Sequence, residues 1–138
     1  MRRAWWVLAL APLLMQAKCN EIQQDIPYVP VDFDINLDLP AYQPLNVPTG
    51  HVLLTGGSQG IVVYRYTVDQ FVAIDRHATY DIPANCVVDV SDDGLFLEDP
   101  CSESQWLIID GSVMNGPATL PLHRYYMSWT PPVLRIYN

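Results

Sequence analysis

Residues 31–39 have the sequence VDFDINLDL, in which every second residue is apolar and every residue between them is aspartate or asparagine. Side chains of a β-strand alternate between the two faces of its sheet, so this period of two predicts a half-buried strand with an acidic outer face. Asp32, Asp34 and Asp38 lie on that face and could be calcium ligands. The glycine-containing loop spacing of a calcium motif is missing, and we therefore expect a solvated strand face.

Eight further short runs are rich in apolar, β-branched and aromatic residues. They cover residues 51–54, 61–66, 71–74, 87–90, 95–97, 106–109, 125–129 and 133–137. Glycine-rich, Asp-Gly and Asn-Gly-Pro turn signals separate them, and no segment after residue 18 has the 3.6-residue period of a helix. Short strands at this spacing predict one all-β domain, a sandwich or small barrel, over residues 31–138.

The charge of the chain argues against one class of partner. The 138 residues include 15 acidic and 7 basic side chains, and Arg2, Arg3 and Lys18 supply three of the basic ones. Four basic residues then face fifteen acidic ones, a net charge of −11, after residue 18. Such a domain is repelled by a phosphate backbone, so we expect no nucleic acid partner.

The first residues have the pattern of an export signal. A basic start, Met1–Arg3, precedes the apolar run AWWVLALAPLLM over residues 4–15. These 12 residues are fewer than the ~18 or more that a membrane-spanning helix needs, and they fit the hydrophobic region of a secretory signal. We therefore expect residues 1–18 to be removed and the domain to be exported.

Cys19 follows this run closely, which resembles a bacterial lipoprotein signal. The resemblance implies a lipid anchor on Cys19, a tether over residues 19–30, and a membrane-anchored protein of the bacterial envelope that faces the periplasm or the cell surface. Ordinary cleavage near Ala17 is the alternative, and a twin-arginine signal built on Arg2 and Arg3 is a weaker one. In an oxidising compartment Cys86 and Cys101 are expected to form a disulfide, which leaves Cys19 as the odd cysteine.

Three stretches resemble the Rieske iron–sulfur family, and they follow in the family's order. They are FVAIDRHATY at 71–80, GLFLEDPCSESQW at 94–106 and GSVMNGPATLPL at 111–122. They are similar to the strand before the first ligand loop, the second ligand loop, and the proline loop with Gly116, Pro117, Ala118 and Pro121. The resemblance covers about residues 50–138 and implies a Rieske-like fold of small antiparallel sheets. The signal and tether also look like those of small exported Rieske-like proteins of Bacteroidetes-type bacteria.

In that family two cysteines and two histidines hold a [2Fe–2S] cluster. The resemblance places these ligands at Ala78, Tyr80, Asp99 and Ser102, none of which can replace thiolate or imidazole on iron. Cys101 occupies the family's structural disulfide position, with Cys86 as its partner, and this bridge would tie the two loops together. The sequence therefore predicts a degenerate site with no cofactor, in which Tyr80 and Asp99 form a hydrogen-bonded plug.

The function predicted from these residues is a non-redox binding or structural module of the envelope, not an enzyme. Its partner would be an envelope protein or a glycan. Five aromatic residues could form a surface that binds this partner, or they could instead belong to the core: Trp106, Tyr80, Tyr125, Tyr126 and Trp129.

Three alternatives stay open. One is electron transfer through [2Fe–2S], as the family implies, and another is a mononuclear metal site of His77 and Asp99 with Asp75. The third is a hydrolytic group that combines Tyr80, Asp99, Ser102 and His77, although it lacks a nucleophile elbow.

Overall fold

The computed structural model describes residues 25–138, which form ten strands and two short 3-10 helices. The strands are β1 (Asp32–Asn36), β2 (His51–Leu54), β3 (Ile61–Arg65), β4 (Phe71–Asp75), β5 (Asp89–Val90), β6 (Phe96–Glu98), β7 (Gln105–Leu107), β8 (Val113–Asn115), β9 (Tyr126–Thr130) and β10 (Val133–Tyr137). The 3-10 helices are η1 (Pro40–Asn46) and η2 (Ile82–Ala84). The predicted signal, the predicted lipidation site Cys19 and the first part of the tether lie outside the described residues. Within those residues, no helix has the length and apolar character needed to cross a membrane.

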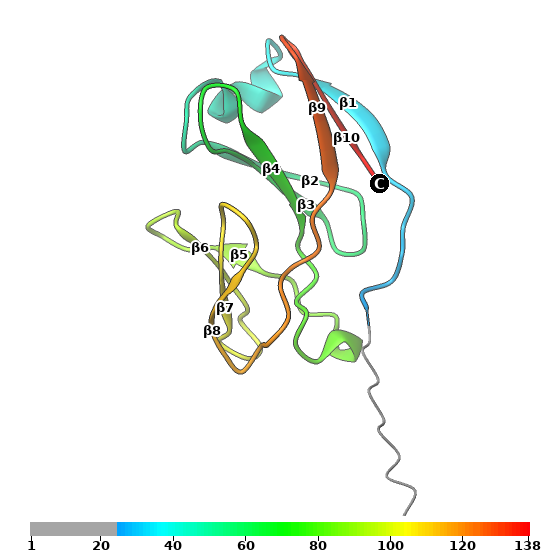
Figure 1. Cartoon of the computed structure of the whole chain (residues 1–138), viewed down its shortest axis with the longest axis vertical. Coiled ribbons are helices and arrows are strands. Elements are labelled where there is room, and N and C mark those ends of the chain that lie inside the picture. The colour runs from blue at the N-terminus through cyan, green and yellow to red at the C-terminus, as the bar shows by residue number, and fades with distance from the viewer. Residues whose placement is uncertain (1–24) are drawn as a thin grey trace, which may run out of the picture.

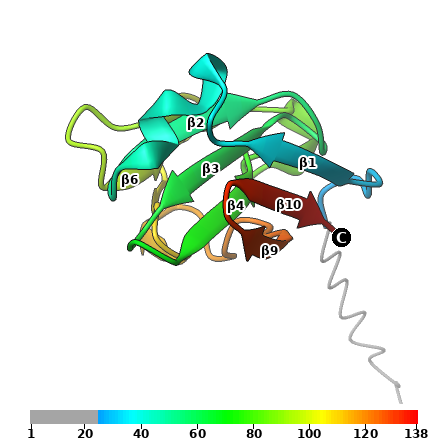
Figure 2. The same ribbon diagram turned by 90° about the horizontal axis from the view of Figure 1, so that it is seen from above.

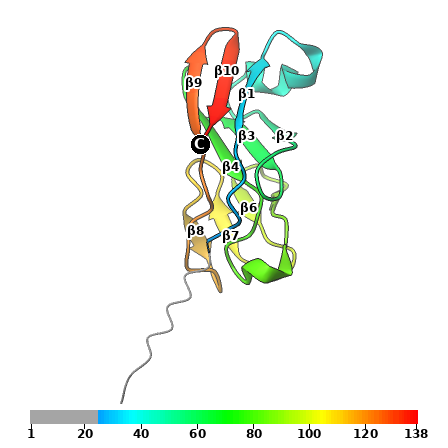
Figure 3. The same ribbon diagram turned by 90° about the vertical axis from the view of Figure 1, so that its right-hand side faces the viewer.

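Three antiparallel sheets make up the domain, as the sequence predicted. Two have three strands, in the orders β1-β10-β9 and β2-β3-β4, and the third has the order β5-β6-β7-β8. Figure 1 shows the four-stranded sheet below the other two, and Figure 2 shows β1, β10 and β9 lying against β2, β3 and β4. Figure 3 shows the resulting elongated molecule from the side. We call the part with the two three-stranded sheets the base and the part with β5 to β8 the tip.

All five residues of strand β3 are buried, which shows that this strand lies at the centre of the molecule. Val62 and Tyr64 point into one hydrophobic core, and Ile61 and Val63 point into another. The tip core contains Val62, Tyr64, Val72, Ile74, Ala78, Cys86, Val88, Leu97, Trp106, Ile108, Ala118 and Leu122. The base core contains Val31, Ile35, Leu37, Leu45, Val52, Ile61, Val63, Ala73, Tyr125, Leu134 and Ile136. A strand buried on both faces explains the nearly continuous apolar run at residues 61–66.

The alternating stretch 31–39 forms a shorter strand than its pattern predicted. Ile35 is buried and Asp32 and Asp34 are exposed, so the predicted inward and outward faces are correct. The strand ends at Asn36, however, because the Asn36 side chain accepts a 2.9 Å hydrogen bond from the Asp38 backbone N–H and closes a turn. Pro40 then starts η1.

Two features were missed by the periodicity analysis. Strand β8 has only three residues between two turns, which is too short for a period of two to be recognised. Helix η1 begins at a proline and has a second one, Pro44, inside, so it carries no α-helical pattern. Of the nine predicted strands, 51–54 and 133–137 have the predicted bounds, and the other strands differ from prediction mainly at their ends.

Candidate functional site

The loops at the predicted site meet at the tip of the molecule. The first connects β4 to β5 over residues 76–88, the second connects β6 to β7 over residues 99–104, and the proline loop follows β8. A disulfide joins Cys86 of the first loop to Cys101 of the second, with their Cα atoms 6.3 Å apart. The predicted bridge is thus confirmed, and it pins the two loops to each other. The Cys101 residue is exposed, whereas Cys86 is buried.

The second loop is organised around the Asp99 carboxylate, which is 1% exposed. Its Oδ1 accepts a 3.0 Å hydrogen bond from the Cys101 backbone N–H, and its Oδ2 accepts a 2.6 Å bond from the Ser102 hydroxyl. Ser102 Oγ also lies 2.8 Å from Ser104 Oγ. Because a hydroxyl has one proton, and Ser102 gives its own to the carboxylate, Ser104 is the donor in that contact. Asp99 and Ser102, the two predicted ligand positions of the second loop, are therefore bonded to each other.

The proline loop completes this network. The Ala118 backbone N–H donates to Ser104 Oγ across 3.0 Å. The Leu120 carbonyl accepts two bonds, one of 2.8 Å from the Thr79 hydroxyl and one of 2.9 Å from the Trp106 indole N–H. Of the predicted proline-loop residues, Ala118 thus bonds to the second loop, and the neighbouring Leu120 bonds to Thr79 of the first. Among the described residues no buried side-chain nitrogen or oxygen lacks a partner. Gly116–Pro117 is a cis peptide bond, and Pro121 is exposed.

The first loop differs from the prediction at Tyr80. Ala78 is buried in the tip core, and its backbone N–H donates to the Cys86 carbonyl across 2.9 Å. The Tyr80 side chain is 41% exposed, and none of the hydrogen bonds found for residues 25–138 involves it. The proposed plug of Tyr80 with Asp99 is therefore wrong in its Tyr80 half. Ser102 and Ser104 occupy that role, because they are short enough to fold back onto the carboxylate.

His77 is fully buried, and both of its ring nitrogens are used. Nε2 lies 2.9 Å from the Ile82 carbonyl and must donate to it, so Nδ1 accepts the 2.7 Å bond from the Ser58 hydroxyl in the neutral ring. Within residues 25–138, one group of three or more potential ligands is close enough to share an ion, and it comprises Cys86, Asp99 and Cys101. The structure does not bring His77 and Asp75 together with Asp99 in such a group.

Asp75 is a buried carboxylate with a structural environment of its own. It accepts four hydrogen bonds, from the Tyr125 hydroxyl at 2.6 Å, the Ser58 N–H at 2.7 Å, the His77 N–H at 2.8 Å and the Gln59 N–H at 3.3 Å. Burial, followed by the bond to Asp75 and the charge of Asp75, raises the pKa of Tyr125 far above its usual range. Gly57 has a φ of +61°, and a Cβ there would lie 2.3 Å from the Tyr125 hydroxyl oxygen, so only glycine lets the loop approach this closely.

These contacts allow the fit of a [2Fe–2S] cluster to be tested. At the four predicted ligand positions, Ala78 has no donor atom, Tyr80 is 41% exposed and has a phenol in place of an imidazole, and Asp99 and Ser102 are hydrogen-bonded to each other. The sulfurs of Cys86 and Cys101 are bonded to one another and are not thiolates. A cluster of this family needs four sulfur and nitrogen ligands, so the residues present do not fit it.

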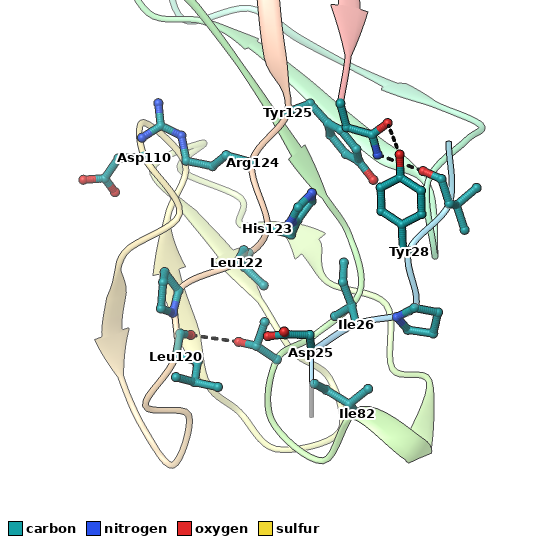
Figure 4. A pocket seen from close by; sticks show the side chains of 15 residues that line it. Asp25, Ile26, Tyr28, Ile82, Asp110, Leu120, Leu122, His123, Arg124 and Tyr125 are labelled. Carbon is teal, nitrogen blue, oxygen red and sulfur yellow. Dashed lines mark hydrogen bonds between the residues drawn. The ribbon is translucent and has the colours of Figure 1, made fainter. Parts of the chain in front are cut away.

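A groove of about 720 Å³ runs beside these loops. Its lining comes from the chain segment 25–29 and from residues 120–125, together with Thr79, Ile82, Asp110 and Asn138. Figure 4 shows the side chains of Leu122 and His123 pointing toward the segment with Ile26. The Asn138 side chain fixes that segment, because it donates to the Val29 carbonyl across 2.9 Å.

The five aromatic residues considered for a surface do not form one. Trp106 is fully buried and Tyr125 is buried at Asp75. Trp129 is half-buried, with the Arg65 guanidinium 5.8 Å from its ring centroid. Tyr80 and Tyr126 are exposed, but they lie in the first tip loop and in β9 of the base. The explanation of these residues as mainly core is correct for Trp106 and Tyr125.

Sequence reasoning missed two serines. Ser58 is hydrogen-bonded to His77, and Ser104 accepts a hydrogen bond from the proline loop. Ser58 is 19 residues away from His77, and only the fold brings them together. Ser104 lies in the quoted second loop, and a small polar residue near the predicted Asp99 was the only signal of its role.

Comparison with known proteins identifies the fold. No protein-family model and no curated protein matches the chain. Among solved structures, the cyanobacterial plasma membrane Rieske protein PetC3 from Synechocystis PCC 6803 matches 64% of this chain and 86% of its own, at 17% identity and a TM-score of 0.54. The complex of reduced oxygenase and oxidized ferredoxin in carbazole 1,9a-dioxygenase provides a chain that matches 78% of this one and 93% of its own, at 18% identity and a TM-score of 0.53. The ferredoxin of carbazole 1,9a-dioxygenase from Nocardioides aromaticivorans IC177 matches 78% and 96%, at 16% identity and a TM-score of 0.52. The fold is therefore Rieske-like, and at these identities the comparison establishes the fold alone.

Proposed function

We propose that this chain is a Rieske-type domain that binds no iron–sulfur cluster and acts as a non-redox binding or structural module at the bacterial cell envelope. The observation that carries the proposal is the bond between Asp99 and Ser102, the two positions that would hold the cluster in the second loop. A carboxylate and a hydroxyl that satisfy each other in a buried site are a stable replacement for two metal ligands.

The rest of the tip supports the same proposal. In a cluster-binding domain the metal helps to hold the ligand loops, and a domain without it needs other cross-links. Here the disulfide joins the first and second loops, and Ser104 and Leu120 join the proline loop to both. The tip therefore has enough internal contacts to keep its shape without an iron atom.

The location at the envelope rests on the sequence. The apolar run at 4–15 and a disulfide in the domain favour export, and Cys19, four residues after the run, favours a lipid anchor. The membrane would then be the first partner, and an envelope protein or a glycan the second. The groove between segment 25–29 and residues 120–125 supports a binding role, because its volume is within the range of ligand sites.

Electron transfer through a [2Fe–2S] centre is the second candidate, and the similarity of the fold to a Rieske protein and to ferredoxins favours it. Against it are the chemical identities of Ala78, Tyr80, Asp99 and Ser102. A hydrolytic role has less support, because both nitrogens of His77 are occupied and Ser102 gives its proton to Asp99.

The test is to measure iron, zinc and acid-labile sulfide per chain, together with a visible spectrum. The protein is made with its own signal in an iron-replete host, and a Rieske ferredoxin made in the same host is the positive control. The proposal expects no sulfide and no visible absorption while the ferredoxin is loaded. Two irons and two sulfides per chain would overturn it and establish the electron carrier.

A further inference from the structure

We propose that the tip becomes a mononuclear site for a thiophilic divalent cation such as Zn²⁺ when its disulfide is reduced, with the thiolates of Cys86 and Cys101 and the carboxylate of Asp99 as ligands. This site differs from the predicted cluster site. It uses the two disulfide cysteines, Cys86 and Cys101, and it shares only Asp99 with the four predicted cluster positions. The inference goes beyond the proposed function and does not depend on it.

The three donors already lie together. One ligand atom each of Cys86, Asp99 and Cys101 are all within 4.8 Å of one another. Zinc binds cysteine sulfur at about 2.3 Å in tetrahedral sites, so its ligand atoms stand about 3.7 Å apart. The Cys86 and Cys101 Cα atoms, 6.3 Å apart, leave room for the freed sulfurs to rotate to that separation. Three protein ligands leave the fourth position of the cation open to water.

Asp99 is held ready for this role. Its Oδ1 is fixed by the Cys101 N–H and its Oδ2 by the Ser102 hydroxyl, which in turn contacts Ser104. Hydrogen-bonded partners behind a ligating carboxylate orient it, and their loss commonly weakens metal binding. Among the described residues no ion pair involves Asp99, so its negative charge is balanced by hydrogen bonds alone.

Reduction requires a co-reactant, which is a dithiol reductant of the thioredoxin type. Its thiolate attacks the exposed Cys101 sulfur, the bond to Cys86 breaks, and Cys86 leaves as a thiolate. The second thiol of the reductant then displaces Cys101, so the reductant is oxidised to a disulfide and two electrons pass to the tip. On binding the cation, any proton that either thiol holds is released, and two thiolates with one carboxylate carry three negative charges, which a divalent cation reduces to one.

The experiment uses the full chain with Cys19→Ser, so that Cys86 and Cys101 are its only cysteines. The protein is reduced with a phosphine, freed of reductant without oxygen, and titrated with Cd²⁺, whose bonds to thiolates absorb in the ultraviolet; Zn²⁺ is then added as competitor. We expect one Cd²⁺ per reduced chain, displacement by Zn²⁺, and no binding to the oxidised chain.

Two matched variants separate this site from a simple dithiol. Asp99→Asn keeps the shape of the side chain and removes its charge, and it should weaken Cd²⁺ binding by about tenfold or more. Asp92→Asn removes an exposed carboxylate outside the cluster and should leave binding unchanged. Equal affinities of the parent chain and the Asp99→Asn variant, or no stoichiometric binding by the reduced chain, would overturn the proposal.

A second measurement covers the case in which Asp99→Asn fails to fold. The disulfide of the Cys19→Ser chain is equilibrated with a dithiol buffer with and without Zn²⁺. Selective binding to the reduced form must make reduction more favourable, and every tenfold change in the equilibrium constant raises the midpoint potential by about 30 mV. An unchanged midpoint at saturating Zn²⁺ would also overturn the site, whereas the iron and sulfide content bears only on the proposed function.

Discussion

The hydroxyl of Ser102 donates a 2.6 Å hydrogen bond to Oδ2 of Asp99, and this contact folds the middle of the loop between β6 and β7 back onto its first residue. It is one link of a chain that continues through Ser104 to the backbone of Ala118. A small number of short polar side chains thus connects the second loop to the proline loop, and the stability of the tip depends on them.

Replacing Ser104 tests this chain of bonds. Ser104→Ala leaves the buried N–H of Ala118 without a partner, which should lower the free energy of unfolding by about 1–3 kcal/mol. Urea denaturation measures the change. Ser128→Ala, at an exposed position of β9, is the control and should change stability by less than about 0.5 kcal/mol. Equal effects of the two substitutions would contradict the assigned role of Ser104.

Removing the disulfide should destabilise the domain without changing any visible spectrum. The cysteines are 15 residues apart, and cross-linking a loop of this length contributes about 3 kcal/mol by restricting the unfolded chain. We expect Cys86→Ser with Cys101→Ser to lower the Tm by about 10 °C in metal-free buffer. Reduction of the parent chain should give a similar decrease. A Tm that stays at the parent value would show that the bridge contributes nothing.

The bond between Tyr125 and Asp75 predicts a pH dependence. Burial raises the pKa of Tyr125 above its ordinary value of 10.0, so the folded chain keeps the phenolic proton at a pH at which the unfolded chain has lost it. The contribution to stability is complete below pH 10 and decreases as the pH rises above 10. Urea denaturation between pH 8 and 11 should show this decrease in the parent and a smaller one in Tyr125→Phe.

The same variant has an effect at neutral pH. Tyr125→Phe removes one of four donors to a buried carboxylate, which should cost about 1.5–3 kcal/mol. Tyr126→Phe changes a neighbouring tyrosine that is 69% exposed, and it serves as the control. Identical pH profiles for the parent and Tyr125→Phe would contradict the assignment of the high pKa to Tyr125.

The lipid anchor is tested by Cys19→Ala. If Cys19 carries the lipid, its loss should move the protein from the membrane fraction to the soluble exported fraction, because the domain then has no acyl chains to insert. Fractionation followed by immunoblotting measures the distribution. The double variant of Cys86 and Cys101 is the control and should remain with the membrane. A Cys19→Ala chain that stays bound would exclude the anchor.

The sequence predicted the parts of the fold that depend on local pattern. The alternation at 31–39 predicted the inner and outer faces of β1, and the apolar run at 61–66 predicted a strand there, although the sequence did not show that this strand, β3, is buried on both faces. The limits of β1 depended on a side-chain turn at Asn36, which a period of two does not encode. Strand β8 was missed because three residues are too few to show a period.

At the tip, the resemblance to Rieske proteins correctly predicted the pairing of Cys86 with Cys101. The predicted hydrogen bond between Tyr80 and Asp99 is wrong, because Tyr80 is exposed. The family pattern predicts the sequence position of a ligand, but it does not predict the contacts that a different side chain makes at that position. The bond of Ser58 to His77 joins β-hairpin and loop residues that are distant in sequence, and only the three-dimensional fold reveals it.

The burial of β3 on both faces has a consequence for how the molecule unfolds. Since the base core and the tip core share β3 and β4, neither core can be exposed to water without stripping side chains from the strands that support the other. We therefore expect base and tip to unfold as a single cooperative unit, and hydrogen exchange should find the backbone amides of β3 to be the last to exchange with solvent.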